Sequence, residues 1–68
     1  MATELNLGEN IKKRRMKSGL SQEDFSQKSG VKYTTLTKIE SGVIKKPSVF
    51  VMAKIAKALG VSIEELLK

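Results

Sequence analysis

Glycine residues divide this 68-residue chain into short segments, each of which carries apolar residues at helical spacing. A glycine at the end of such a segment suits the left-handed backbone conformation that commonly ends a helix. The glycines in question are Gly19, Gly30, Gly42 and Gly60. No segment shows sustained alternation of polar and apolar residues, which would indicate a half-buried strand. The chain is therefore predicted to be all-α, a compact five-helix bundle that forms one domain over residues 1–68.

Local capping signals predict where three of the five helices begin. A serine before a helix can accept a hydrogen bond from a free backbone N–H of the first turn, and Ser21 with Asp24 forms a pair of the capping-box kind. Ser48, directly after Pro47, and Ser62 are predicted to cap the last two helices. The predicted helices span residues 7–17, 21–29, 32–41, 48–59 and 62–67, and residues 1–5 are expected to form a flexible N-terminal arm.

Apolar spacing also predicts which side chains face the core. A core of this size supplies only about 3–5 kcal/mol of net stability, so the helices must be locally consistent with the fold. The side chains predicted to face inward on the first four helices are Leu7, Ile11, Met16, Phe25, Leu36, Ile39, Val49, Met52, Ala53, Ala56 and Leu59.

The chain contains neither cysteine nor histidine, which excludes several classes of protein. Without cysteine there is no disulfide framework and no thiolate metal site, and without histidine the commonest zinc ligand and general base are missing. No cofactor, no metal ion and no enzymatic activity are therefore expected. No apolar run approaches the roughly 20 residues that span a bilayer, and no signal peptide opens the chain, so we expect a cytoplasmic protein.

Basic residues outnumber acidic ones by 13 to 7, which gives a formal net charge of +6 and a sequence pI of about 9.9. A pI above about 9 indicates a candidate nucleic-acid-binding domain, although charge alone fits an anionic membrane equally well. A membrane-surface protein is disfavoured because no single helix combines a strongly basic face with a broad aromatic one. We interpret the basic run over residues 12–17 as a solvated helix face rather than a direct DNA contact.

The most informative stretch runs from residue 21 to residue 42. Two short helical segments joined by a turn at Gly30 and Val31 fit the helix-turn-helix unit. The sequence LSQEDFSQKSGVKYTTLTKIESG closely resembles the phage-repressor and Cro family of bacterial transcription regulators, and the resemblance extends to LGENIKKRR before it and PSVFVMAKIAKALGVSIEELL after it. It implies a lambda-repressor-like domain that binds double-stranded DNA sequence-specifically. It further implies a repressor or autoregulator that acts as a homodimer on a palindromic operator.

The resemblance assigns roles to individual residues of this chain. Base-reading roles fall on Tyr33, Thr34 and Lys38. Contacts to phosphates or the DNA backbone fall on Gln22, Lys32, Thr35, Thr37, Lys45 and Lys46. A buried ion pair between the first and third helices falls on Arg15 and Glu40. Four positions depart from the family pattern. Lys32 stands where a Ser or Thr cap is common, and Phe50 and Val51 stand at typically polar positions of the fourth helix. Ser26 replaces a small Ala between the two motif helices, and we expect the helices still to cross in the same way.

The residue types of the third helix support DNA binding independently of the resemblance. Most of its polar side chains share one face, opposite Leu36 and Ile39. Lysine can donate to the major-groove acceptors of guanine, and threonine can hydrogen-bond bases or contact a thymine methyl group. Residues 32–46 contain four lysines and one glutamate, a local net charge of +3 that suits contact with phosphates.

Dimerisation is predicted from the fourth helix. The inward set assigned above leaves Phe50 and Val51 on an adjacent face, where an exposed apolar pair indicates a partner surface. If Phe50 instead folds back over Pro47 or the neighbouring loop, the contact moves to the last helix, around Ile63 and Leu67. The alternative function is an antitoxin or protein-interaction module, whose apolar C-terminal helices would bind a partner such as a toxin.

Overall fold

The computed structural model describes residues 7–68 and consists of five helices, with no strand in that range. The helices are α1 (Leu7–Lys17), α2 (Gln22–Ser29), α3 (Tyr33–Glu40), α4 (Val49–Leu59) and α5 (Ile63–Leu66). The predicted all-α, five-helix architecture is therefore confirmed, and each helix lies within a residue or so of its predicted bounds. The flexible arm expected over residues 1–5 lies outside the described residues.

The predicted helix boundaries follow from local chemistry. The hydroxyl oxygens of Ser21, Ser48 and Ser62 accept hydrogen bonds from backbone N–H groups three residues later, at 3.0, 3.2 and 3.2 Å. Gly30 and Gly60 end α2 and α4 in the left-handed conformation, with φ of 78° and 72°. A side chain at such a φ would be strained, so these two positions require glycine.

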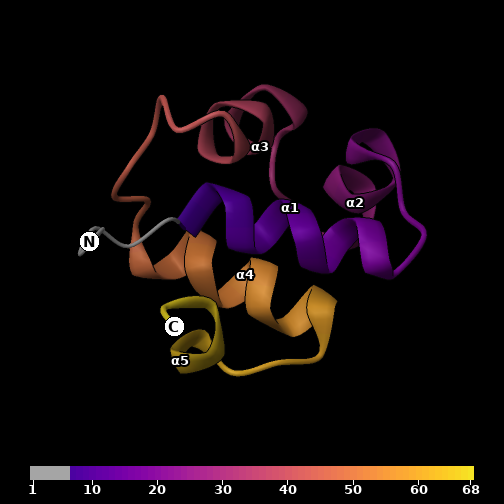
Figure 1. Cartoon of the computed structure of the whole chain (residues 1–68). Coiled ribbons are helices and arrows are strands. Elements are labelled where there is room, and N and C mark those ends of the chain that lie inside the picture. Colours follow the sequence, from indigo (N-terminus) through magenta and orange to yellow (C-terminus); the bar gives the residue numbers. More distant parts are fainter. Residues whose placement is uncertain (1–6) are drawn as a thin grey trace.

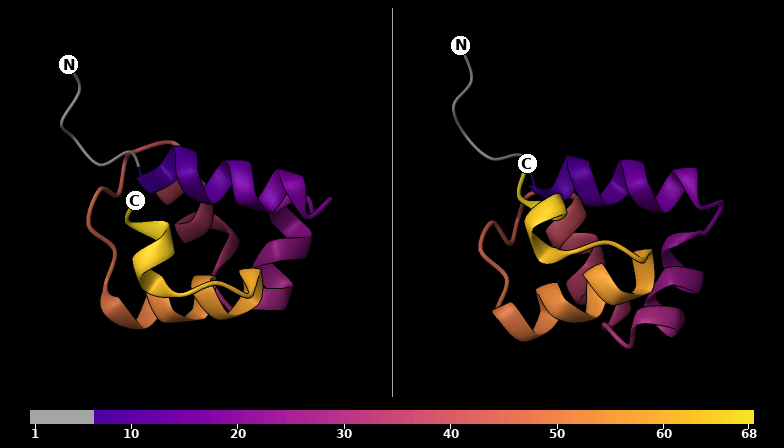
Figure 2. Two further views of the ribbon diagram at one scale, coloured as in Figure 1. Left: turned by 60° about the horizontal axis from the view of Figure 1, so that its bottom comes forward. Right: turned by 90° about the horizontal axis from the view of Figure 1, so that it is seen from below.

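Helix α1 lies across the middle of the molecule, with α2 and α3 on one side and α4 and α5 on the other (Figure 1). The C-terminus lies beside the start of α1 (Figure 2). Side chains from all five helices enclose one core. No helix within residues 7–68 has the length and apolar character needed to cross a membrane. The buried apolar side chains are Leu7, Ile11, Phe25, Val31, Leu36, Ile39, Met52, Ile55, Ala56 and Leu66.

Three side chains predicted to face the core are exposed instead. Met16 is 60% exposed, and the neighbouring Arg15 is buried instead. On α4, Val49 and Ala53 face solvent, whereas Ile55 is completely buried. The first residues of α4 are all apolar, so a helical period fits more than one inward face. The packing of α4 against α2 and α5 selects the face of Met52, Ile55 and Ala56.

Two contacts near the start of α1 hold it against α5 and α3. The Asn10 side-chain amide donates to the carbonyl oxygen of Leu66 at 2.9 Å, at the C-terminal end of α5. Arg14 Nε donates to the Asn10 Oδ1 atom at 2.9 Å and so orients this amide. At Gly8, the α1 backbone approaches α3 so closely that an added Cβ would lie 2.8 Å from the Glu40 carbonyl oxygen and closer still to that of Ile39. Glycine is therefore required at position 8.

Candidate nucleic-acid interface

The turn between α2 and α3 is closed by side-chain hydrogen bonds. The Ser26 hydroxyl donates to the carbonyl oxygen of Val31 at 2.6 Å, and the Val31 N–H donates to the Ser29 hydroxyl oxygen at 3.2 Å. Val31 itself is buried in the core. Ser26 therefore does more than fit between the two helices, because its hydroxyl fastens the turn and sets how α3 projects from the bundle.

Arg15 and Glu40 form a buried ion pair between α1 and α3, on the residues that the resemblance implies. Arg15 Nε donates to one Glu40 carboxylate oxygen at 2.8 Å, and Arg15 Nη2 donates to the other at 3.1 Å. Their side chains are only 9% and 2% exposed. A third guanidinium nitrogen, Nη1, donates to the Leu20 carbonyl oxygen at 2.6 Å. The pair thus joins α1, the segment before α2, and α3.

Gln22 connects the ion pair to the start of α2. Its side-chain amide nitrogen donates to a Glu40 carboxylate oxygen at 3.0 Å. A glutamine amide carries two hydrogens, and Glu40 takes one of them. Because the side chain is half-buried, the amide is held in place at the first position of α2. The second amide hydrogen remains able to donate to another acceptor.

The exposed face of α3 carries the residues predicted to read bases. Tyr33, Thr34 and Lys38 are exposed, while Leu36 and Ile39 beneath them have no exposed surface. The helix begins at Tyr33, one residue after its predicted start, and Lys32 precedes it without a side-chain capping bond. The Lys32 side chain is also exposed.

Thr35 and Thr37, assigned to the DNA backbone, are half-buried. The Thr37 hydroxyl donates its hydrogen to the carbonyl oxygen of Thr34 at 2.9 Å. A hydroxyl has one donor hydrogen, so Thr37 can donate to a phosphate only after it rotates away from Thr34.

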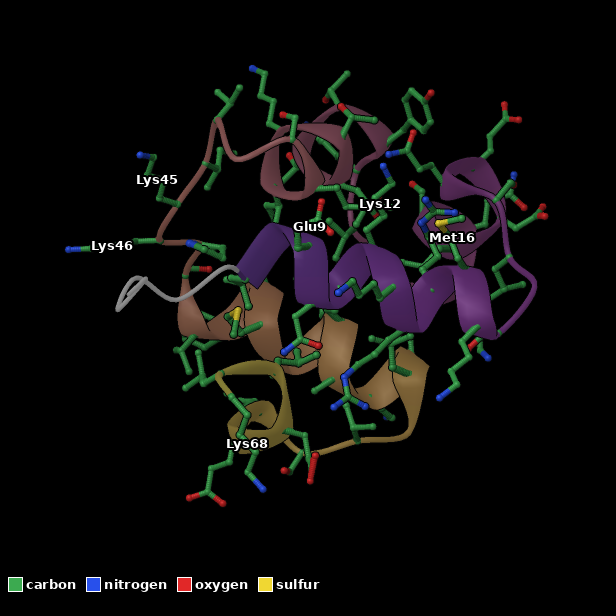
Figure 3. The ribbon with its side chains drawn as sticks, in the orientation of Figure 1. Glu9, Lys12, Met16, Lys45, Lys46 and Lys68 are labelled. Atoms are coloured by element: carbon green, nitrogen blue, oxygen red, sulfur yellow. The ribbon has the colours of Figure 1, made fainter. Side chains whose placement is uncertain are left out.

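The segment between α3 and α4 is anchored at its middle. The Ile44 N–H donates to the carbonyl oxygen of Lys38 at 3.0 Å, and the half-buried Ile44 side chain packs against the core. Lys45 and Lys46 follow directly and project from the edge of the molecule (Figure 3). Sequence reasoning missed the anchoring role of Ile44, although an isolated apolar residue among Gly and Lys residues could have indicated it.

The exposed charges of α3 and of the segment that follows it are all positive. The exposed lysines of residues 32–46 are Lys32, Lys38, Lys45 and Lys46. The one acidic residue in that range, Glu40, is buried and paired with Arg15. The surface presented by α3 and the following segment therefore has four positive charges and no exposed acid within residues 32–46. On α1, by contrast, Lys12 and Glu9 are both exposed and lie three residues apart, which suits a solvated face (Figure 3).

A family model described as helix-turn-helix matches residues 11–66 of the chain. The protein is a Cro/CI-type helix-turn-helix protein. The helix-turn-helix protein is similar to solved structures of SinR and of a restriction-modification controller protein. It is therefore a DNA-binding transcription regulator, and its family points to regulation rather than catalysis.

The structural matches cover most of the helix-turn-helix protein. SinR, the master regulator for biofilm formation, in complex with DNA is 32% identical with a TM-score of 0.88, and the match covers 91% of this chain and 98% of that one. In the SinR–SinI complex the same identity and TM-score apply, but the match covers only 60% of that SinR chain. The controller protein C.AhdI from Aeromonas hydrophila is 29% identical with a TM-score of 0.84, covering 91% of this chain and 92% of that one.

Proposed function

We propose that this regulator binds a palindromic operator as a homodimer, with α3 of each copy in the major groove. The exposed polar face of α3, bordered by lysines and free of exposed acids, is the observation that carries this proposal. The base-reading residues are Tyr33, Thr34 and Lys38. The residues that hold phosphates or sugars are Gln22, Lys32, Thr35, Thr37, Lys45 and Lys46. SinR, whose structure is similar, has been solved in complex with DNA, which supports DNA binding by this chain.

The test separates residues that read bases from those that bind phosphates. Lys38→Ala is expected to weaken operator binding by about 1–3 kcal/mol and to relax the preference at one base position. Lys45→Ala is expected to weaken binding to all duplexes alike and to lower the salt dependence by about one unit. Lys57→Ala, an exposed lysine at the end of α4 on the other side of α1, serves as the control.

Operator sites are first selected from random duplex DNA, and affinities are then measured by fluorescence anisotropy over a range of salt concentrations. A selected palindrome supports two copies on one site. Equal losses for Lys38→Ala on operator and random DNA would show that Lys38 does not read bases.

The proposed homodimer contact is centred on Phe50. Its side chain is 78% exposed, which contradicts the alternative that it folds back over Pro47. Val51 is half-buried and packs against the core, so little of it is left for a partner. Ile63 is half-buried in the same way, and Leu67 is 45% exposed. A single short helix reads few base pairs, and two such helices about 34 Å apart reach successive major grooves.

Sedimentation equilibrium of Phe50→Glu tests this contact. We expect the variant to dissociate into monomers and to bind the palindromic operator more weakly, because a charge replaces an apolar side chain that a partner buries. Met16→Glu is the matched control, since Met16 is an exposed apolar residue on α1. A Phe50→Glu variant as dimeric as the Met16→Glu control would refute this surface.

A further inference from the structure

An apolar groove lies where the segment before α4 meets α4, α5 and the start of α1. Its apolar lining includes Pro47, Val49, Met52, Ile63 and Leu67, and its volume is about 320 Å³. Pockets for small ligands range from about 300 to 1,000 Å³, so this groove has room for a few side chains rather than a folded surface.

The groove leaves apolar surface in contact with water. Val49, the first residue of α4, and Leu67, which directly follows α5, are both exposed. Exposed apolar surface of this kind, when rimmed by polar groups, marks a binding site for a partner. Burial of a partner's apolar side chains here would remove this surface from water.

The rim of the groove determines the charge of that partner. Lys45 and Lys46 line the groove together with the apolar residues, and among residues 7–68 no acidic residue lines it. An isologous contact with a second copy would place the same two lysines of each copy in one interface, where like charges repel. A segment with acidic side chains would instead pair with both lysines.

We propose that this groove binds an acidic amphipathic segment of a partner protein. The apolar face of the partner segment would lie against Val49 and Leu67, and the Asp or Glu side chains of that segment would lie against Lys45 and Lys46. This is the helix-in-groove mode of recognition with an added charge requirement.

Binding of such a segment excludes DNA, an inference that rests on the proposed function. Lys45 and Lys46 are proposed to bind phosphates, and the same two ammonium groups cannot pair with carboxylates at the same time. The groove therefore makes DNA binding by the regulator sensitive to an acidic partner.

A designed probe tests the site. The probe is a fluorescein-labelled peptide of about 12 residues with leucines on one helical face and glutamates beside them. Control peptides replace every glutamate by glutamine or scramble the order at unchanged composition. Anisotropy is measured at about 150 mM salt, where exposed charges more than about 8 Å apart are largely screened.

Three variants distinguish the groove from general charge attraction. Leu67→Gln and the double variant Lys45→Gln/Lys46→Gln are expected to bind the probe at least about tenfold more weakly. The double variant Lys54→Gln/Lys57→Gln removes the same charge from α4 and is expected to change binding by less than about twofold. Circular dichroism of each variant verifies that it is folded.

Several results overturn the proposal. These are no saturable binding of the probe, equal binding of the scrambled peptide, or an equal loss in the Lys54/Lys57 variant. A Leu67→Gln variant that becomes monomeric while Phe50→Glu stays dimeric shows that a second copy occupies the groove, and this also overturns it.

Competition with DNA tests the regulatory part separately. The probe is expected to displace labelled operator from the unmodified protein, and the glutamine peptide is not. Probe binding without displacement overturns the exclusion of DNA. Operator binding in the absence of probe is measured in parallel. A protein that binds the probe but no operator would contradict the proposed function and leave the groove as a binding site.

Discussion

Replacing Glu40 by glutamine is expected to remove most of the protein's stability. The carboxylate accepts three hydrogen bonds, from Arg15 Nε at 2.8 Å, Arg15 Nη2 at 3.1 Å and the Gln22 amide at 3.0 Å. Glutamine has nearly the same shape but no charge, so the buried Arg15 guanidinium loses its counter-ion. Breaking a buried pair costs about 3–5 kcal/mol, which is comparable with the whole net stability of a domain this small.

The measurement is urea and thermal unfolding followed by circular dichroism. In a domain of 60–100 residues, 1 kcal/mol lowers the Tm by about 4–8 °C, so a fall of more than about 12 °C is expected. Glu65→Gln is the matched control, because Glu65 pairs with Arg14 at 3.4 Å with both side chains partly exposed. An exposed pair of this kind contributes about 0–1 kcal/mol.

The apolar double variant Arg15→Met/Glu40→Leu separates the charge from the position. Exchanging a buried pair for apolar side chains of similar size is often neutral, so the double variant should recover much of the stability that Glu40→Gln loses. A Glu40→Gln variant within about 0.5 kcal/mol of the parent protein, the range of ordinary surface substitutions, would show that Arg15 does not need this counter-ion. A double variant no more stable than Glu40→Gln would show that the loss does not come from the unpaired charge.

Two further substitutions test how α1 is held. Gly8→Ala is expected to destabilise by about 1–3 kcal/mol through overpacking, although alanine favours helices, because its Cβ would meet the carbonyl oxygens at the end of α3. An unchanged Tm would show that α1 shifts freely. Asn10→Ala is expected to lower stability by about 1–3 kcal/mol and to speed amide hydrogen exchange in α5, whose C-terminal carbonyls it binds. Unchanged exchange in α5 would contradict that anchoring role.

Helix boundaries could be predicted because their causes are local. Ser21, Ser48 and Ser62 each bond an N–H three residues away, and a glycine at φ 78° ends α2. The motif at residues 21–42 is local in the same sense, since its turn and both helices are consecutive in the chain. Family membership follows from that order and spacing.

The assignment of inward faces depended on tertiary structure. Neighbouring positions on a helix differ by about 100° in direction, so the rotation of α1 about its axis decides whether Arg15 or Met16 faces the core. The buried carboxylate of Glu40 on α3 favours the guanidinium, and Met16 is left in solvent. On α4, apolar residues surround the helix, and only its neighbours determine that Ile55 is buried and Val49 exposed.

The sequence by itself determined the number of helices, their ends and the polar character of α3, because capping and periodicity act over a few residues. Tertiary structure alone decided which residues from distant parts of the sequence lie in contact. Asn10 meets Leu66 across 56 residues, and the lysines at 45 and 46 border a groove formed with α5. No local pattern encodes such contacts, since they arise only when the helices pack around a common core and bring distant side chains within hydrogen-bonding distance.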